Sequence, residues 1–246
     1  MQKTTLIIQV KVGNTTGYAY DNPVGDICES VLMPTVQRYC QKYNYDYLLI
    51  NEYPKDKDIT FFNRNTKSID HDYSQAGKNK CSTLIRYLNM NKDYDQIVSL
   101  DNDIWVPEHA EKLPKIKGHM AAEDKGKSWK TFRNAFELPY DKFVNGGVQM
   151  VNRKAGNNLY SYINNVVDKK TNPPLNYHSD QSYMNYWRHK NFNMSYVLDS
   201  KWNFMASCEK RRSDYTGVNF VHYAGVAARK LLHEDLKYGI IKLKLL

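Results

Sequence analysis

The sequence predicts an α/β protein with a mainly parallel central sheet and flanking helices. Short apolar segments at residues 6–12, 45–50 and 96–100 alternate with segments whose apolar residues recur at helical spacing. Two carboxylates, Asp101 and Asp103, directly follow the last of these segments, and α/β sheets place ligands at the carboxyl ends of their strands. The chain has 246 residues, of which 41% are hydrophobic, which is enough for one substantial core.

The first expected unit is a strand followed by a helix. Residues 6–12 form an apolar run that ends at a Gly-Asn turn signal, which predicts the strand. Apolar residues then recur at helical spacing over residues 27–43. Pro34 lies within this stretch, and proline lacks the N–H that a helix interior needs. We therefore expect Pro34 either to kink the helix or to begin a second one.

The remaining elements are expected in a regular order along the chain. In the first half we expect a strand at 45–50, a polar irregular segment at 51–79, a short helix at 81–88 and a strand at 96–100. In the second half we expect strands at 120–122, 148–151, 195–198 and 220–223, with helices at 156–168 and 181–189. The basic and apolar segment 236–246 predicts either a terminal helix packed on the core or a segment docked on a membrane surface.

Composition and charge exclude several classes of protein. No apolar run approaches the ~18 residues of a membrane-spanning helix, and the four cysteines form no CxxC pair that would indicate a zinc ribbon. The apolar run near the N-terminus is too short for a secretory signal, so we expect a cytoplasmic protein. The net charge of +9 is typical of a protein that meets an anion, such as nucleic acid, an acidic membrane or a phosphate-bearing small molecule.

The strongest local motif is Asp101-Asn102-Asp103, between an apolar strand and the apolar residues 104–106. Two like charges this close resist desolvation unless a cation or protons lie between them. Carboxylate oxygens suit a hard divalent cation, for which Mg²⁺ or Mn²⁺ is usual. The alternative is a surface turn, because Asp and Asn favour turns after strands.

This motif and three later blocks resemble the GT-A-fold glycosyltransferases, in particular glycosyltransferase family 8 and related retaining enzymes. The later blocks are Phe-Val-Asn-Gly-Gly-Val-Gln-Met-Val-Asn at 143–152, His-Ser-Asp-Gln-Ser at 178–182 and Val-His-Tyr-Ala-Gly at 221–225. They occur in the family's order and extend over nearly the whole chain. The resemblance implies a single GT-A (Rossmann-like) domain over 1–246, with a nucleotide-binding half at 1–106 and an acceptor-side half at 107–246.

The resemblance also implies a function. It is that of a metal-dependent hexosyl- or pentosyltransferase, which moves a sugar from a nucleoside diphosphate donor, a UDP-sugar, to a hydroxyl of an oligosaccharide or glycan with retention. An inverting enzyme with Asp124, Asp141 or Asp180 as base is the nearest alternative. The alternatives of another class are a metal-dependent nucleic-acid-binding protein and a sugar-binding module without catalysis. The sequence lacks a third clustered carboxylate, a phosphate-binding loop and RNA-recognition motifs, so we expect no nucleic-acid partner.

The implied metal ligands are Asp101, Asp103 and His222, and Asp101 is also implied to contact the donor's ribose. A nitrogen donor beside carboxylates favours Mn²⁺ over Mg²⁺. Without the resemblance, His222 between Val221 and Tyr223 would be interpreted as a core histidine.

The Asn-Gly-Gly block and the Asp-Gln block supply the implied sugar contacts. Asn145, Gly146 and Gly147 are expected at the donor, because an amide bonds hydroxyls and glycines permit close approach or a positive φ. An Asn-Gly hairpin turn is the alternative. Asp180 and Gln181 are the expected catalytic residues, facing the sugar ring, and helix capping is their alternative.

Cationic side chains are expected at the donor phosphates. The family pattern has a lysine three residues after Gly225, but Ala228 occupies that position, so a shift of one or two residues in a loop would be needed for a substitute. The candidates for the phosphate contacts are Lys80, Arg86, Arg229 and Lys230. Two weaker candidates complete the site: Asp124 in the sugar pocket, and Trp202 with Asn203 in an acceptor-side wall or in the core.

Overall fold

The computed structural model describes residues 5–10, 27–50, 84, 88, 94–126, 143–168, 180–209 and 215–241. The expected surface segment 51–79 and most of the expected helix 81–88 lie outside these ranges. Of that helix, Leu84 and Leu88 are described, and both are helical and buried.

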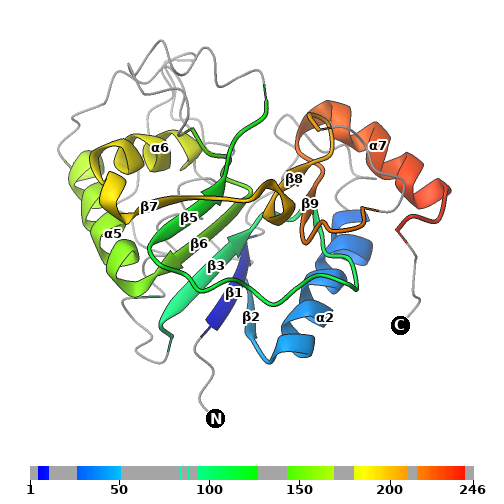
Figure 1. The fold of residues 1–246 in the computed structure, drawn as a ribbon, viewed down its shortest axis with the longest axis horizontal. Coiled ribbons are helices and arrows are strands. Elements are labelled where there is room, and N and C mark those ends of the chain that lie inside the picture. The colour runs from blue at the N-terminus through cyan, green and yellow to red at the C-terminus, as the bar shows by residue number, and fades with distance from the viewer. Residues whose placement is uncertain are drawn as a thin grey trace.

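A six-stranded sheet forms the centre of the described fold, with strand order β2-β1-β3-β6-β5-β7 (Figure 1). Its strands are β1 (Thr5–Val10), β2 (Asp46–Ile50), β3 (Gln96–Leu100), β5 (His119–Ala122), β6 (Val148–Asn152) and β7 (Ser195–Leu198). Every strand of this sheet runs parallel to the others except β6, which is antiparallel to its neighbours β3 and β5. The predicted α/β class with a mainly parallel sheet is confirmed.

The reversed direction of β6 gathers several polar segments at one edge of the sheet. Asp101 follows β3 and Asp124 follows β5, whereas residues 145–147 precede β6. The Asp101 amide donates to the carbonyl of Gly147 at 2.8 Å, and the Asn145 amide donates to the carbonyl of Ala122 at 2.9 Å. The segments on either side of 145–147 pair with other strands and not with each other, so the hairpin alternative for the Asn-Gly pair is wrong.

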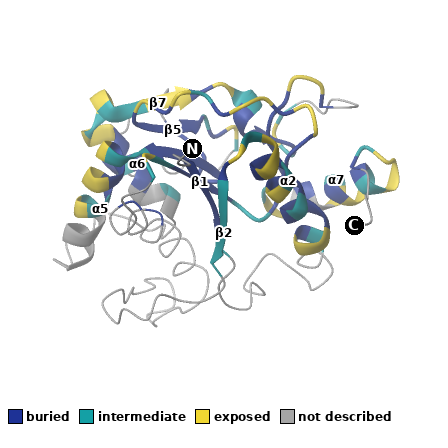
Figure 2. Cartoon of the chain, turned by 90° about the horizontal axis from the view of Figure 1, so that it is seen from below, coloured by how far each residue is buried: buried dark blue, intermediate teal, exposed yellow. Residues whose placement is uncertain are grey.

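Helices cover both faces of the sheet. On one face lies α2 (Met33–Tyr43), which continues from a π-helical turn, η1 (Cys28–Leu32), with Pro34 in its first turn, directly after the π-helical residues. On the other face lie α5 (Arg153–Asp168) and α6 (Asp180–Lys190). Buried strands separate these layers, and the yellow outer surfaces of the helices are exposed (Figure 2). The inner strands are therefore largely apolar on both faces, as in other sheets covered on two sides.

A second, three-stranded sheet lies beyond the edge that carries Asp101. It consists of β4 (Ile104–Trp105), β9 (Val221–His222) and β8 (Phe204–Met205), in the order β4-β9-β8. Ile104 lies opposite His222 in the antiparallel pair, and Met205 lies beside His222 in the parallel pair. This register brings the residues just before β4 and just before β8 close to His222.

Helix α6 is fixed to the central sheet by a buried arginine. The Arg188 guanidinium donates to Nδ1 of His119 at 2.7 Å and to the carbonyl of Tyr196 at 2.9 Å. Complete burial, together with the neighbouring Arg188 charge, holds the pKa of His119 well below its usual range, so the ring is neutral and accepts this bond. The helix that begins with Asp180 and Gln181 is thereby held on β5 and β7.

The chain continues from the small sheet into α7 (Gly225–Lys237). The helix expected at 236–246 is wrong for the described residues, because α7 ends at Lys237 and 238–241 are not helical. Leu236 and Ile240 are nevertheless half-buried, and Ile241 is buried against the cluster beneath α7. These residues pack as the core alternative predicts, and residues 242–246 lie outside the described ranges. None of the helices in the described ranges is long and apolar enough to cross a bilayer.

Candidate active site

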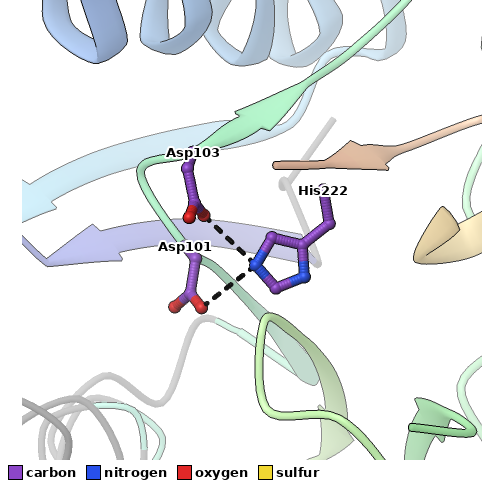
Figure 3. A group of neighbouring side chains, drawn as sticks. All are labelled: Asp101, Asp103 and His222. Atoms are coloured by element: carbon purple, nitrogen blue, oxygen red, sulfur yellow. Dashed lines mark ion pairs between the residues drawn. The ribbon is translucent and has the colours of Figure 1, made fainter. Parts of the chain in front are cut away.

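Two carboxylates and an imidazole lie close together at the edge of the sheet where β3 and β5 end (Figure 3). Nε2 of His222 lies 3.2 Å from Oδ1 of Asp103 and 3.7 Å from Oδ2 of Asp101. One ligand atom from each residue lies within 4.8 Å of the others. The metal-site prediction requires this proximity, and the donor set of carboxylate oxygens and one imidazole nitrogen suits Mn²⁺.

The backbone turns out of β3 immediately after the strand, which allows both carboxylates to face one point. The carbonyl of Asp103 accepts the Tyr223 amide at 3.0 Å, and this bond holds the turn against β9. The Asp103 side chain is only 7% exposed, whereas that of Asp101 is 38% exposed. A buried carboxylate does not fit the alternative of a solvated surface turn, and Asp101 lies on the open side of the group.

A buried glutamine supports the turn from β1. Nε2 of Gln9 donates to the Asp101 carbonyl at 3.0 Å, and its Oε1 accepts the Tyr47 hydroxyl at 2.9 Å. Burial raises the pKa of Tyr47 to about 12, so its hydroxyl remains a donor at neutral pH. The sequence reasoning missed Gln9, although a lone polar side chain inside an apolar strand was a usable signal.

Gln181 bridges α6 to the same edge. Its Nε2 donates to Oδ2 of Asp124 at 2.6 Å, and its Oε1 accepts the Gly146 amide at 2.8 Å and, more weakly, Nδ2 of Asn145 at 3.4 Å. Three residues predicted for the sugar site, Asn145, Gly146 and Gln181, are therefore neighbours. Asp124, a weaker candidate in the sequence, is their buried partner.

Asn203 connects this amide group to the carboxylate–imidazole group. Its Nδ2 lies 2.9 Å from Oδ1 of Asn145, and its Oδ1 lies 3.0 Å from Nδ1 of His222. Trp202 packs in the main hydrophobic cluster, as the core alternative predicts, and Asn203 is buried between Asn145 and His222. The polar residues form one connected network from Asp124 to Asp103.

Gly147 leaves the space that the His222 ring occupies. A Cβ atom at this position would lie 2.2 Å from Cε1 and 2.5 Å from Nδ1 of His222. Real side chains never approach so closely, and Gly147 does not have a positive φ. Of the two expected reasons for a glycine here, close approach is the one that the structure shows.

The residues around Ala228 that were expected near the donor phosphates belong to α7. Residues 225–237 form one helix, so Arg229 and Lys230 lie on α7 and not in a loop, and Ala228 packs into the hydrophobic cluster beneath α7. Gly225 has a φ of +77° at the start of α7, a conformation that favours glycine. Lys230 is exposed on α7.

The remaining candidates lie wholly or partly outside the described residues. Lys80, Arg86 and Asp141 are not described, and nor are the side chains of Asp180 and Arg229, although their backbones belong to α6 and α7. The roles of these residues stay predictions.

Comparison with solved structures finds glycosyltransferases of the same fold. A glycosyltransferase involved in glycosylation of the major capsid of PBCV-1 superposes with a TM-score of 0.55 and 13% identity over 93% of this chain and 98% of its own. The galactosyltransferase LgtC, solved with donor and acceptor sugar analogues, superposes with a TM-score of 0.54 and 15% identity over 89% of this chain and 87% of its own. The bifunctional glycosyltransferase WbbM superposes with a TM-score of 0.53 and 15% identity over 92% of this chain and 46% of its own.

Sequence comparison finds no matching family model and no matching curated protein. The structural matches cover nearly the whole chain, so the fold is the GT-A fold of glycosyltransferases, with an Asp-Xaa-Asp motif at a strand end. At these identities the likeness establishes the fold, and the narrower assignment to family 8 stays a prediction.

Proposed function

We propose that this chain is a metal-dependent glycosyltransferase that moves a sugar from a nucleoside diphosphate donor to a hydroxyl of a glycan. The observation that carries the proposal is the convergence of Asp101, Asp103 and His222 at the ligand edge of a GT-A sheet. The donor proposed is a UDP-sugar, the metal Mn²⁺, and the stereochemical course retention.

The chemistry of such a transfer explains why these residue types belong there. The leaving diphosphate gains negative charge as the glycosidic bond breaks, and a bound divalent cation would stabilise that charge. Asp101, Asp103 and His222 would hold the cation, with the more exposed Asp101 turned toward the donor. Asn145 and Gln181 would orient the sugar through their amides, and Lys80, Arg229 and Lys230 remain the candidates for the phosphates.

Several features support the proposed division of the chain. The proposed nucleotide-binding half, 1–106, contains β1, β2, β3 and the Asp-Xaa-Asp motif, and the proposed acceptor-side half, 107–246, contains the amide network.

Asp124 is engaged by Gln181 and by the Gly126 amide at 2.7 Å, so it acts in positioning and not as a base in this proposal. Retention then needs no protein base, because a departing phosphate oxygen can take the acceptor's proton.

A thermal-shift screen of nucleoside diphosphate sugars, with and without Mn²⁺, tests the proposal. A UDP-sugar with Mn²⁺ should stabilise the protein, by about 2.7 kcal/mol when present at ~100 times its Kd. Free sugar and UMP serve as controls and should give smaller shifts. Sugar transfer to a glycan acceptor, with NMR of the new linkage, then gives the anomeric configuration. If no nucleoside diphosphate sugar stabilises the protein in a metal-dependent way, the proposal is wrong.

Gln181→Ala should lower turnover at least ~10-fold while donor affinity is largely kept. The amide would act on the sugar mainly in the transition state, and water at this half-buried position can take over its bonds to Gly146 and Asp124. The measurement is kcat and KM for the donor, together with the melting temperature.

Gln41→Ala is the matched control for Gln181→Ala. Gln41 is an exposed glutamine of α2, and its loss should change none of these values. Normal turnover in Gln181→Ala would leave Gln181 with only a structural link between α6 and the sheet.

A further inference from the structure

We infer that Asn203 is a positioning residue that sets the tautomer of His222, so that Nε2 carries the lone pair that faces Asp101 and Asp103. This inference rests on the proposed metal site. A relay of hydrogen bonds leads to His222 from a group whose polarity is fixed by its chemistry.

The first group is the Gly147 backbone amide. It donates to the Asn145 side chain at 2.8 Å, and a backbone N–H can only donate. The atom of Asn145 that faces it must therefore be the carbonyl oxygen. The orientation of the Asn145 amide is fixed by the main chain and by no titratable group.

The second group is the Asn203 side chain. The same oxygen of Asn145 lies 2.9 Å from Asn203, and an oxygen can only accept. Asn203 must present its NH₂ group to Asn145, which turns its own oxygen to the opposite side. Both side chains are buried, at 7% and 1% exposure, so solvent does not compete for these bonds.

The third group is His222. The oxygen of Asn203 lies 3.0 Å from Nδ1 of His222, so Nδ1 must carry a hydrogen. In a neutral imidazole the other nitrogen then has the lone pair. That nitrogen, Nε2, lies 3.2 Å from Oδ1 of Asp103, so a cation bound by the carboxylate could also accept this lone pair.

The relay therefore presents His222 as a metal ligand and not as a hydrogen-bond donor to the carboxylates. With the opposite tautomer, the ring would donate Nε2–H to Asp103 and close the site to a cation. Groups behind a metal-binding histidine commonly fix its tautomer in this way, and their loss typically costs 10–100-fold in metal affinity.

The direct test is ¹⁵N NMR of histidine-labelled, metal-free protein at a pH well above the ordinary histidine range. Long-range ¹H–¹⁵N correlations identify which ring nitrogen is protonated, and His222→Gln assigns the signal. The expected result is protonated Nδ1 and unprotonated Nε2 in the wild type. A wild type with protonated Nε2 overturns the inference without the need for any further variant.

The variants separate positioning from simple packing. Asn203→Leu removes the acceptor, so we expect a mixed or reversed tautomer and a loss of about 10–100-fold in affinity for Mn²⁺ alone, measured by EPR. Asn203→Asp keeps an acceptor toward Nδ1 but loses the donor toward Asn145, so the wild-type tautomer should remain and part of the Mn²⁺ affinity should be restored. A folded Asn203→Leu protein with the wild-type tautomer and affinity overturns the inference.

Asn219→Leu is the matched control. Asn219 is buried to the same degree, at 1% exposure, but its side chain bonds Glu111, away from the site. Its loss should lower stability and leave the His222 tautomer and the Mn²⁺ affinity unchanged. The tautomer is measured without metal or substrate, so a protein with the expected tautomer that binds no Mn²⁺ would contradict the proposed function and not the relay.

Discussion

Asp103→Asn should reduce sugar transfer by about 100-fold or more while the protein stays folded. The substitution removes the charge of the most buried carboxylate of the group, and loss of one strong electrostatic stabiliser costs this much in other enzymes. The fold should survive, because the change relieves repulsion between Asp103 and Asp101 and leaves the backbone bond from Tyr223 in place. Transfer rates over a range of Mn²⁺ concentrations, with the melting temperature, measure both effects.

Asp95→Asn is the control for this change. Asp95 lies just before β3, its side chain is 74% exposed, and it forms an ion pair with Arg153 at 3.9 Å. An exposed pair of this kind contributes little, so its loss should alter neither transfer nor Mn²⁺ dependence. If Asp103→Asn keeps full Mn²⁺-dependent transfer, the metal-site assignment is wrong.

Gly147→Ala should reduce sugar transfer about as much as Asp103→Asn does, although it removes no polar group. The new methyl would overlap the His222 ring, so the ring must be displaced or the turn before β6 must shift. Either movement disturbs the placement of Nε2 relative to the carboxylates, and we expect both Mn²⁺ affinity and transfer to fall by about 100-fold, the scale of losing a strong electrostatic stabiliser. Mn²⁺ titration and transfer assays measure these losses.

Two further variants show whether the overlap with His222 is the cause. Gly156→Ala places a methyl 2.3 Å from Cδ1 of Leu88, a similar overlap in a different part of the core, and it should lower stability without changing Mn²⁺ affinity. In a His222→Ala background, Gly147→Ala should cost less than it does alone, because only the smaller overlap with Oδ1 of Asn145, at 2.9 Å, remains. Full additivity of Gly147→Ala and His222→Ala would contradict this explanation.

The sequence alone determined the α/β class, most element positions and the identity of the carboxylate motif. Hydrophobic periodicity is local, and the sheet covered on both faces left continuous apolar strands that are visible in the chain. The strand at Gln96–Leu100 and the strand at Ser195–Leu198 lie where the sequence predicted them. Pro34 marked the start of α2 because its effect on a helix is a property of the residue itself.

The tertiary structure alone decided which side of the sheet each later motif would occupy. No local signal reveals that β6 is antiparallel, yet this reversal brings residues 145–147 to the edge where β3 and β5 end. For the same reason the sequence could not exclude the Asn-Gly hairpin, because the partners of its flanking segments are distant in the chain.

The roles of Asn203 and Gly147 depended on the tertiary structure most of all. Asn203 has no motif around it, and its position between Asn145 and His222 results from the register of the small sheet and the close approach of two strand ends. The sequence indicated that Gly147 permits a close approach or a positive φ, but the histidine that it accommodates lies 75 residues further along the chain. Hydrogen bonds and steric contacts depend on distances of a few ångström, and those distances are set only when the whole chain has folded.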